Sequence, residues 1–250
     1  MTSQKKIYFA SDFHLGAPNF EASLVREKKI VRWLNEIEAD ASALYLMGDM
    51  FDFWFEYRNV VPMGFTRLLG KLADLSDKGI EIVLFSGNHD LWIRDYLPKE
   101  INCVVHHKPI IREFDGKKFY LAHGDGLGPG DHGFKFMKKI FVGKFNQWLF
   151  RRLHPDTGVD MARYFSRTSR AHTGVKDAKF LGEDKEWLII HSKEELKKQH
   201  IDYFIYGHRH YPLNLELPGG SRYINLGDWI EYFTYGVWDG HTFELKKYDR

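Results

Sequence analysis

Apolar residues along this chain alternate between short continuous runs and longer stretches with helical spacing. The short runs at 6–10, 44–47 and 80–85 predict buried strands, because a strand covered on both faces is apolar throughout. Between them, apolar residues at 21–38 and 65–75 recur every three or four positions, which predicts amphipathic helices. Strands that alternate with helices favour βαβ units and an α/β fold.

Further short apolar runs continue this pattern to the end of the chain. Runs at 101–105, 110–114 and 118–122 predict strands, and Asp115-Gly116 predicts a hairpin turn between the last two. A helix is expected at 184–199. Short strands, separated by Pro-Gly-Gly and Asp-Gly turns, are then expected at 202–206, 213–217, 222–226, 232–238 and 242–247.

One segment, at about 131–176, interrupts the alternation. It is helical in character, rich in Phe, Trp and Arg, and broken at His154-Pro155-Asp156. Residues 135–176 hold ten Lys or Arg and two Asp, a net charge of +8, whereas the remainder holds 26 basic and 32 acidic residues, a net charge of −6. This asymmetry indicates an anionic partner: phosphate, nucleic acid or an acidic membrane surface. We therefore expect one domain over 1–250 with a helical insertion.

Composition and length narrow the class of protein. The 250 residues are 44% hydrophobic and 28% charged, which is typical of a globular domain. The single cysteine, Cys103, excludes an internal disulfide and favours a reducing compartment. No apolar run reaches the length of a signal-peptide core or a membrane span. The sequence therefore predicts a cytoplasmic protein.

Polar residues of a particular kind follow five of the expected strands. In chain order they are Asp12 and His14, Asp49, Asn88 and His89, His123, and His208 and His210. Ligands in open α/β sheets bind beyond the carboxyl ends of the strands. We therefore expect these side chains to form one site.

The types of side chain indicate a metal site. Apart from His89, the set contains two Asp, one Asn and four His, without thiolate. Such ligands suit Mn²⁺, Fe²⁺, Co²⁺ or Zn²⁺, and the number of imidazoles disfavours Mg²⁺ or Ca²⁺. Seven ligands are too many for one tetrahedral ion and fit two ions that share a carboxylate. Two metals roughly 3.5–4 Å apart can activate water and stabilise a phosphoryl group during displacement.

The ordered motifs resemble those of the calcineurin-like metallophosphoesterase superfamily. They read Asp12-x-His14, Gly48-Asp49, Gly87-Asn88-His89-Asp90, His123 and Gly207-His208-x-His210. The resemblance implies an αββα sandwich of two mixed β-sheets flanked by helices, with the segment at 131–176 as a helical lid.

The resemblance also implies a role for each site residue. One metal would be held by Asp12, His14 and His210, and the other by Asn88, His123 and His208, with Asp49 bridging them. His89 would lie beside the phosphate as general acid or charge stabiliser, and Asp90 would orient its imidazole.

Longer stretches resemble one subfamily, the UDP-2,3-diacylglucosamine hydrolases of lipid A biosynthesis. They are "GDMFDFWFEY", "HGDGLGPGD", the insertion after it, and "GHRHYPLNLEL". This resemblance implies cleavage of a pyrophosphate to UMP and 2,3-diacylglucosamine 1-phosphate at the cytoplasmic face of the inner membrane, typically with Mn²⁺. It places Asp131, Ser169, Arg170 and Lys176 near the nucleotide and sugar. The basic, aromatic insertion fits an anionic membrane surface and acyl chains.

Two alternatives stay open. Characterised hydrolases of this subfamily carry arginine after the metal-binding Asn, where this chain has His89, the residue common in the wider superfamily. A related phosphoesterase acting on another monoester, diester or nucleotide is therefore the second hypothesis. A metal-bearing nucleic-acid-binding protein is the third. It ranks lowest, and no nucleic acid is expected, because the aromatic residues of the basic segment have helical spacing rather than forming a strand platform.

Overall fold

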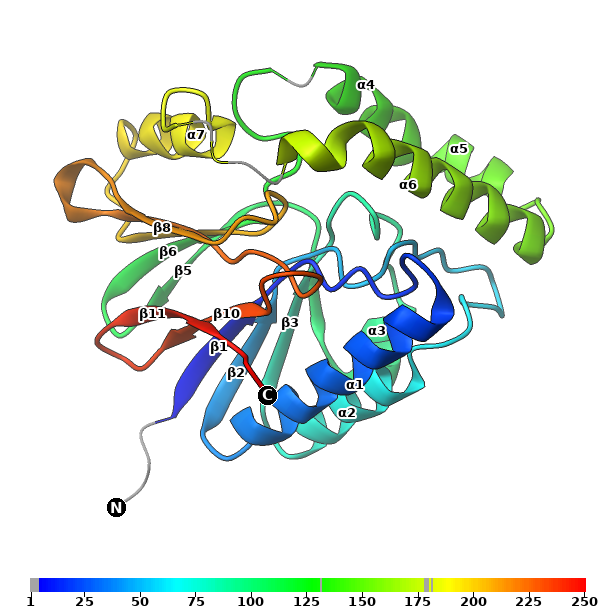
Figure 1. Cartoon of the computed structure of the whole chain (residues 1–250), viewed down its shortest axis with the longest axis horizontal. Coiled ribbons are helices and arrows are strands. Elements are labelled where there is room, and N and C mark those ends of the chain that lie inside the picture. Colours follow the sequence, from blue (N-terminus) through cyan, green and yellow to red (C-terminus); the bar gives the residue numbers. More distant parts are fainter. Residues whose placement is uncertain (1–4, 131, 178–179, 181) are drawn as a thin grey trace.

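Two β-sheets lie face to face at the centre of the computed structural model, with helices on their outer faces (Figure 1). The structure describes residues 5–130, 132–177, 180 and 182–250, and at 167 and 169–177 it describes the backbone alone. The first sheet has the order β11-β10-β1-β2-β3-β4. Its parallel strands are β1 (Lys6–Ala10), β2 (Ala41–Leu46), β3 (Glu81–Phe85) and β4 (Val104–His106). The antiparallel strands are β10 (Thr234–Trp238) and β11 (Phe243–Lys247).

The second sheet is also mixed. It has the order β5-β6-β7-β9-β8. The parallel strands at its centre are β6 (Lys117–Leu121), β7 (Tyr203–Tyr206) and β9 (Arg222–Asn225). The antiparallel strands at its edges are β5 (Ile110–Phe114) and β8 (Leu213–Glu216).

Three apolar layers hold these sheets and helices together. Between the sheets, Phe9 of β1 packs in one cluster with Phe119 of β6 and Ile205 of β7. On the outer face of the first sheet lie α1 (Phe20–Ile37), α2 (Thr66–Asp77) and α3 (Tyr96–Ile101). On the outer face of the second lies α7 (Trp187–Leu196). Successive strand residues point to opposite faces, so a strand that is covered on both sides is apolar throughout. Two mixed sheets between outer helices confirm the predicted αββα sandwich.

The sequence did not predict helix α3. It occupies the stretch just before a strand that was expected at 101–105 and that is observed at 104–106. The carboxylate of Glu56 accepts the backbone N–H groups of Arg94, Asp95 and Tyr96 at 2.8–3.1 Å. These groups at the start of the helix are thus satisfied by a residue about forty positions away, a contact that no local pattern reveals.

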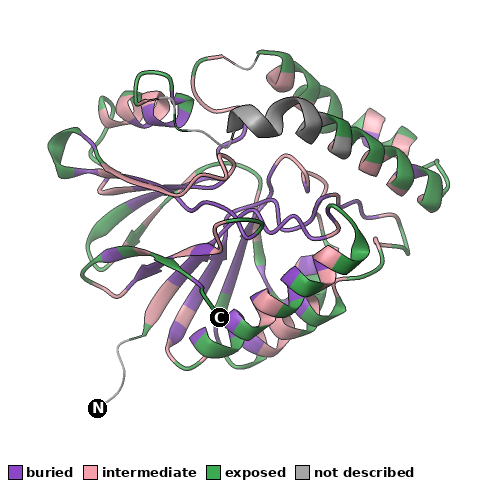
Figure 2. Ribbon diagram, in the orientation of Figure 1, coloured by how far each residue is buried: buried purple, intermediate pink, exposed green. Residues whose placement is uncertain are grey.

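The insertion forms three helices that cross the carboxyl ends of the strands (Figure 1). They are α4 (His132–Phe141), α5 (Lys144–Phe150) and α6 (Pro155–Asp177). Phe150 packs on Phe55 and Trp92 of the body, with ring centroids 4.7 and 4.9 Å apart. Much of the described surface of these helices is exposed, as Figure 2 shows. Among the described residues, no helix combines the length and the apolar character needed to span a membrane.

Candidate metal centre

The seven predicted ligands come together at the carboxyl ends of five strands. Asp12 and His14 follow β1, Asp49 follows β2, Asn88 follows β3, His123 follows β6, and His208 and His210 follow β7. Four of them are buried, namely Asp12, His14, Asp49 and His123. The other three, Asn88, His208 and His210, are partly accessible. The parallel strands deliver them to one edge, as the sequence predicts.

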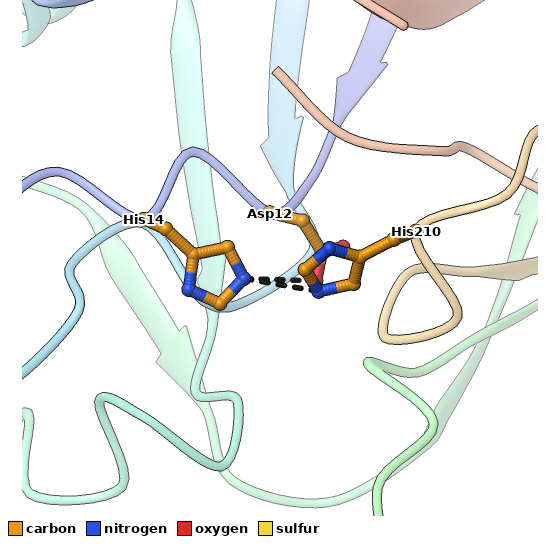
Figure 3. A group of neighbouring side chains, drawn as sticks. All are labelled: Asp12, His14 and His210. Atoms are coloured by element: carbon orange, nitrogen blue, oxygen red, sulfur yellow. Dashed lines mark hydrogen bonds and ion pairs between the residues drawn. The ribbon is translucent and has the colours of Figure 1, made fainter. Parts of the chain in front are cut away.

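Three of these residues form a first group (Figure 3). Nε2 of His210 lies 3.3 Å from Oδ1 of Asp12 and 3.1 Å from Nε2 of His14. Nε2 of His14 lies 3.6 Å from the same Asp12 oxygen. One oxygen and two ring nitrogens thus point at a common position.

A second group lies next to the first, and Asp49 belongs to both. Oδ1 of Asn88 lies 2.9 Å from Nδ1 of His208 and 3.3 Å from Nε2 of His123. Oδ2 of Asp49 lies 3.4 Å from Nε2 of His123 and 3.7 Å from Nε2 of His14 in the first group. A single carboxylate oxygen therefore reaches both groups, which is the geometry that a bridging ligand requires.

The backbone is strained where it carries these side chains. Nine described non-glycine residues have positive φ, and five of them are predicted ligands: Asp12, His14, Asp49, His208 and His210. Such conformations concentrate at functional sites, where the surrounding structure holds them in place. Two glycines before ligands are required by close approach, since a Cβ at Gly87 would collide with the Asp49 carboxylate and one at Gly207 with the Ser11 hydroxyl.

Contacts behind two imidazoles fix which nitrogen faces the site. Nδ1 of His123 donates to the carbonyl oxygen of Met47 at 2.8 Å. Because a carbonyl oxygen can only accept, Nδ1 carries a proton, and Nε2 is the nitrogen that faces Asp49 and Asn88. Nδ1 of His210 lies 3.3 Å from Oδ2 of Asp228, so its Nε2 faces Asp12 in the same way. Partners of this kind orient metal-binding histidines.

The electrostatics of the site favour positive charge. Burial alone would raise the pKa of Asp12, but the neighbouring histidines, His210 first among them, together outweigh it and lower the pKa to about 2. Burial alone would lower the pKa of His123 and of His210, but the surrounding aspartates together outweigh it and raise these values to about 10 and about 9. The strongest of these aspartates is Asp49 at His123 and Asp12 at His210. Oδ1 of Asp12 is buried and receives no hydrogen bond within the described part of the chain. These donors and this charge fit divalent cations that prefer oxygen and imidazole ligands.

His89 lies at the same site, but the expected partner of its ring is different. Nδ1 of His89 is 3.1 Å from the carbonyl oxygen of Asp52. The carboxylate of Asp90 instead accepts the backbone N–H groups of Gly87 at 2.7 Å and Met50 at 2.9 Å. Burial, together with the charge of Asp49, raises the pKa of Asp90 to about 7. The expectation that Asp90 orients the His89 imidazole is therefore wrong, and Asp52 takes that position.

Sequence reasoning missed two residues of the site. Asp52 lies three positions after Asp49 in the same motif, and Asp228 follows β9. The strand-end pattern that identified the predicted ligands also applies to Asp228, which lies behind the His210 ring. Of the four predicted substrate contacts, Asp131 lies outside the described residues. Ser169, Arg170 and Lys176 lie on α6, but their side chains are outside the described part of the structure.

Comparisons with known proteins show the family of this chain. The family model described as "Calcineurin-like phosphoesterase" matches residues 5–212. A UDP-2,3-diacylglucosamine hydrolase from Porphyromonas gingivalis is 42% identical over 97% of this chain and 97% of its own. A protein of the same name from Aeromonas hydrophila is 31% identical over 89% of this chain and 90% of its own. The solved structure of Yfce, a phosphoesterase from E. coli, has a TM-score of 0.44 and 16% identity, covering 93% of this chain and 87% of that one. This chain belongs to the calcineurin-like phosphoesterase family.

Proposed function

We propose that this protein hydrolyses the pyrophosphate bond of UDP-2,3-diacylglucosamine to UMP and 2,3-diacylglucosamine 1-phosphate, a step of lipid A biosynthesis. The observation that carries the proposal is the similarity, over almost the whole length, to hydrolases named for that substrate. The paired groups joined by Asp49 support hydrolysis at phosphorus.

The site would hold two divalent ions. Asp12, His14 and His210 would bind one, and Asn88, His123 and His208 the other, with Asp49 shared between them. The donor set suits Mn²⁺, with Fe²⁺, Co²⁺ or Zn²⁺ as alternatives. When bound, such ions polarise a phosphoryl oxygen and lower the pKa of water.

The chain's own residues orient the reacting groups. The side chain of His89 is 13% exposed beside Asp49 and His14, so it can contact a phosphoryl oxygen or the leaving group. Asp90 fixes the loop that carries Asn88 and His89, because its carboxylate binds backbone N–H groups on both sides of the site. The predicted substrate contacts Asp131, Ser169, Arg170 and Lys176 would bind the nucleotide and sugar from the insertion.

The insertion supports a membrane-bound substrate. Phe136, Phe145 and Trp148 expose 66%, 71% and 51% of their surface on α4 and α5. These aromatic residues are interleaved with lysines of the segment 135–176, which carries a net charge of +8. A basic helical surface with exposed aromatic residues suits an anionic bilayer, and here it would bind the cytoplasmic face of the inner membrane.

The test is a product assay with purified protein. Incubated with Mn²⁺ and UDP-2,3-diacylglucosamine, the protein should release UMP in equal amount to the sugar phosphate. The Asp49→Ala variant serves as the control for contaminating hydrolases. Turnover of bis(p-nitrophenyl) phosphate without UMP release would favour the second hypothesis, a phosphoesterase for another substrate.

A further inference from the structure

The ring of His89 is held by two residues that are far from it in the sequence. Nδ1 lies 3.1 Å from the carbonyl oxygen of Asp52, 3.6 Å from Oδ1 of Asp52 and 3.3 Å from the hydroxyl of Ser166. Ser166 in turn donates to Oδ1 of Asp52 at 2.9 Å. The three side chains thus form one connected hydrogen-bonding group.

This arrangement determines the protonation of the ring. The Asp52 carbonyl oxygen can only accept a hydrogen bond, so Nδ1 of His89 must carry a proton. Nε2 is then the nitrogen left to exchange a proton or a hydrogen bond with a ligand. The side chain of His89 is 13% exposed, whereas Asp52, on the Nδ1 side of the ring, is 6% exposed.

The two partners come from different parts of the fold. Asp52 is fixed to the body, because its backbone N–H donates to the carbonyl oxygen of Leu15 at 2.9 Å. Ser166 belongs to α6 of the insertion, 114 positions from Asp52. The hydrogen bond between them therefore connects the lid directly to a residue of the metal site.

We propose that Ser166 of α6 is a positioning residue, which holds the His89 imidazole with Nε2 toward the substrate through its contacts with Nδ1 of His89 and with the Asp52 carboxylate. Helix α6 must be seated on the body for this. The inference rests on the proposed function for its substrate and on the contacts of His89 for its mechanism. It assigns the lid a role in catalysis in addition to binding the substrate.

The variants separate this role from a merely structural one. Ser166→Ala removes one hydroxyl, and we expect kcat to fall about five- to tenfold with KM within about twofold of its normal value. Asp52→Asn keeps the shape and should lower kcat by a larger factor. The matched control is Thr168→Ala, because Thr168 is exposed on the same helix and bonds the carbonyl oxygen of Tyr164. It should keep the normal kcat.

A double-mutant cycle tests whether the three residues act together. In a His89→Gln background, Ser166→Ala should have no further effect, because the ring it positions is gone. A second readout does not depend on turnover. In ¹⁵N-histidine spectra, the His89 resonance, identified by its loss in His89→Gln, should show a protonated Nδ1 whose proton exchanges faster in Ser166→Ala.

Three results would overturn the inference. They are a normal kcat in Ser166→Ala, additive effects in the His89→Gln background, or loss of bound metal in Asp52→Asn. Loss of metal would mean that Asp52 acts on His14, whose Nδ1 lies 3.9 Å from Oδ1 of Asp52. Metal content is therefore measured for every variant. If the unmodified protein releases no UMP, the proposed function fails separately, and the same comparison is made with bis(p-nitrophenyl) phosphate.

Discussion

The guanidinium of Arg26 donates a hydrogen bond of 2.6 Å to the backbone carbonyl oxygen of His14. The same nitrogen donates to the carbonyl oxygen of Ala17 at 2.5 Å, and Arg26 is only 7% exposed. Arg26 of helix α1 thus supports the loop after β1, in which His14 has a φ of 43°. The buried guanidinium therefore adds a charged donor to two carbonyl oxygens of the loop, one of which also accepts the backbone N–H of Ala17.

Replacing this arginine should loosen the metal site. In Arg26→Met, the carbonyl oxygens of His14 and Ala17 both lose a charged donor, and His14 keeps only the backbone N–H of Ala17 at 3.1 Å. The free energy of unfolding should therefore fall by about 2–4 kcal/mol. Urea denaturation of the metal-free protein measures this loss. Arg32→Met, an exposed position on the same helix, is the control and should change it by less than about 0.5 kcal/mol. Equal losses in both variants would show that Arg26 does not support the loop.

The position of Asp49 between the two groups predicts that both of the proposed metals depend on it. Asp49→Ala should abolish hydrolysis of every phosphoester, because its Oδ2 faces His14 in one group and His123 in the other. Elemental analysis should find less than two metal ions per chain in this variant. Asp77→Ala, at the exposed end of α2, is the control. Activity that survives Asp49→Ala would contradict the two-metal mechanism.

The sequence predicts the site better than its surroundings. The ligands follow from a local rule, because each stands directly after an apolar run that is long enough to be recognised as a strand. The contacts of Glu56 with α3 and of Asp52 with His89 span about forty residues, and loop geometry decides them. Asp90 shows the difference clearly. Its neighbour in the sequence is His89, but its carboxylate is turned to the backbone of Gly87 and Met50.

The single cysteine gives a pH-dependent prediction away from the metal site. Burial raises the pKa of the Cys103 thiol from 9.0 to about 11, and the residue is 7% exposed. In the unfolded chain the thiol ionises first, so its contribution to stability is complete below about pH 9 and is lost as the pH rises toward 11.

Two measurements check this behaviour. At pH 8 the folded protein should react with a thiol reagent only as fast as it opens, and labelling should follow the urea unfolding transition. Between pH 9 and pH 11, Cys103→Ala should lose less stability than the unmodified protein, since both carry the same tyrosines and lysines. Rapid labelling of the folded protein at pH 8 would show that the thiol is accessible.

Substitutions in the exposed aromatic pair on α5 test the proposed contact with the membrane. The rings of Phe145 and Trp148 are stacked with centroids 5.9 Å apart, and the guanidinium of Arg152 lies 4.9 Å from the Trp148 ring. Burying a large apolar side chain in the interface is worth about 1.5–3 kcal/mol. Phe145→Ser and Trp148→Ser should therefore each weaken binding to vesicles containing phosphatidylglycerol by about tenfold or more.

Sedimentation with vesicles measures the binding, and neutral vesicles should bind the unmodified protein weakly, because the basic residues supply part of the affinity. Val25→Ser removes a side chain that is 69% exposed on α1, outside the insertion, and serves as the control. Normal binding by both α5 variants, or an equal loss in Val25→Ser, would show that the insertion does not form the membrane-binding surface.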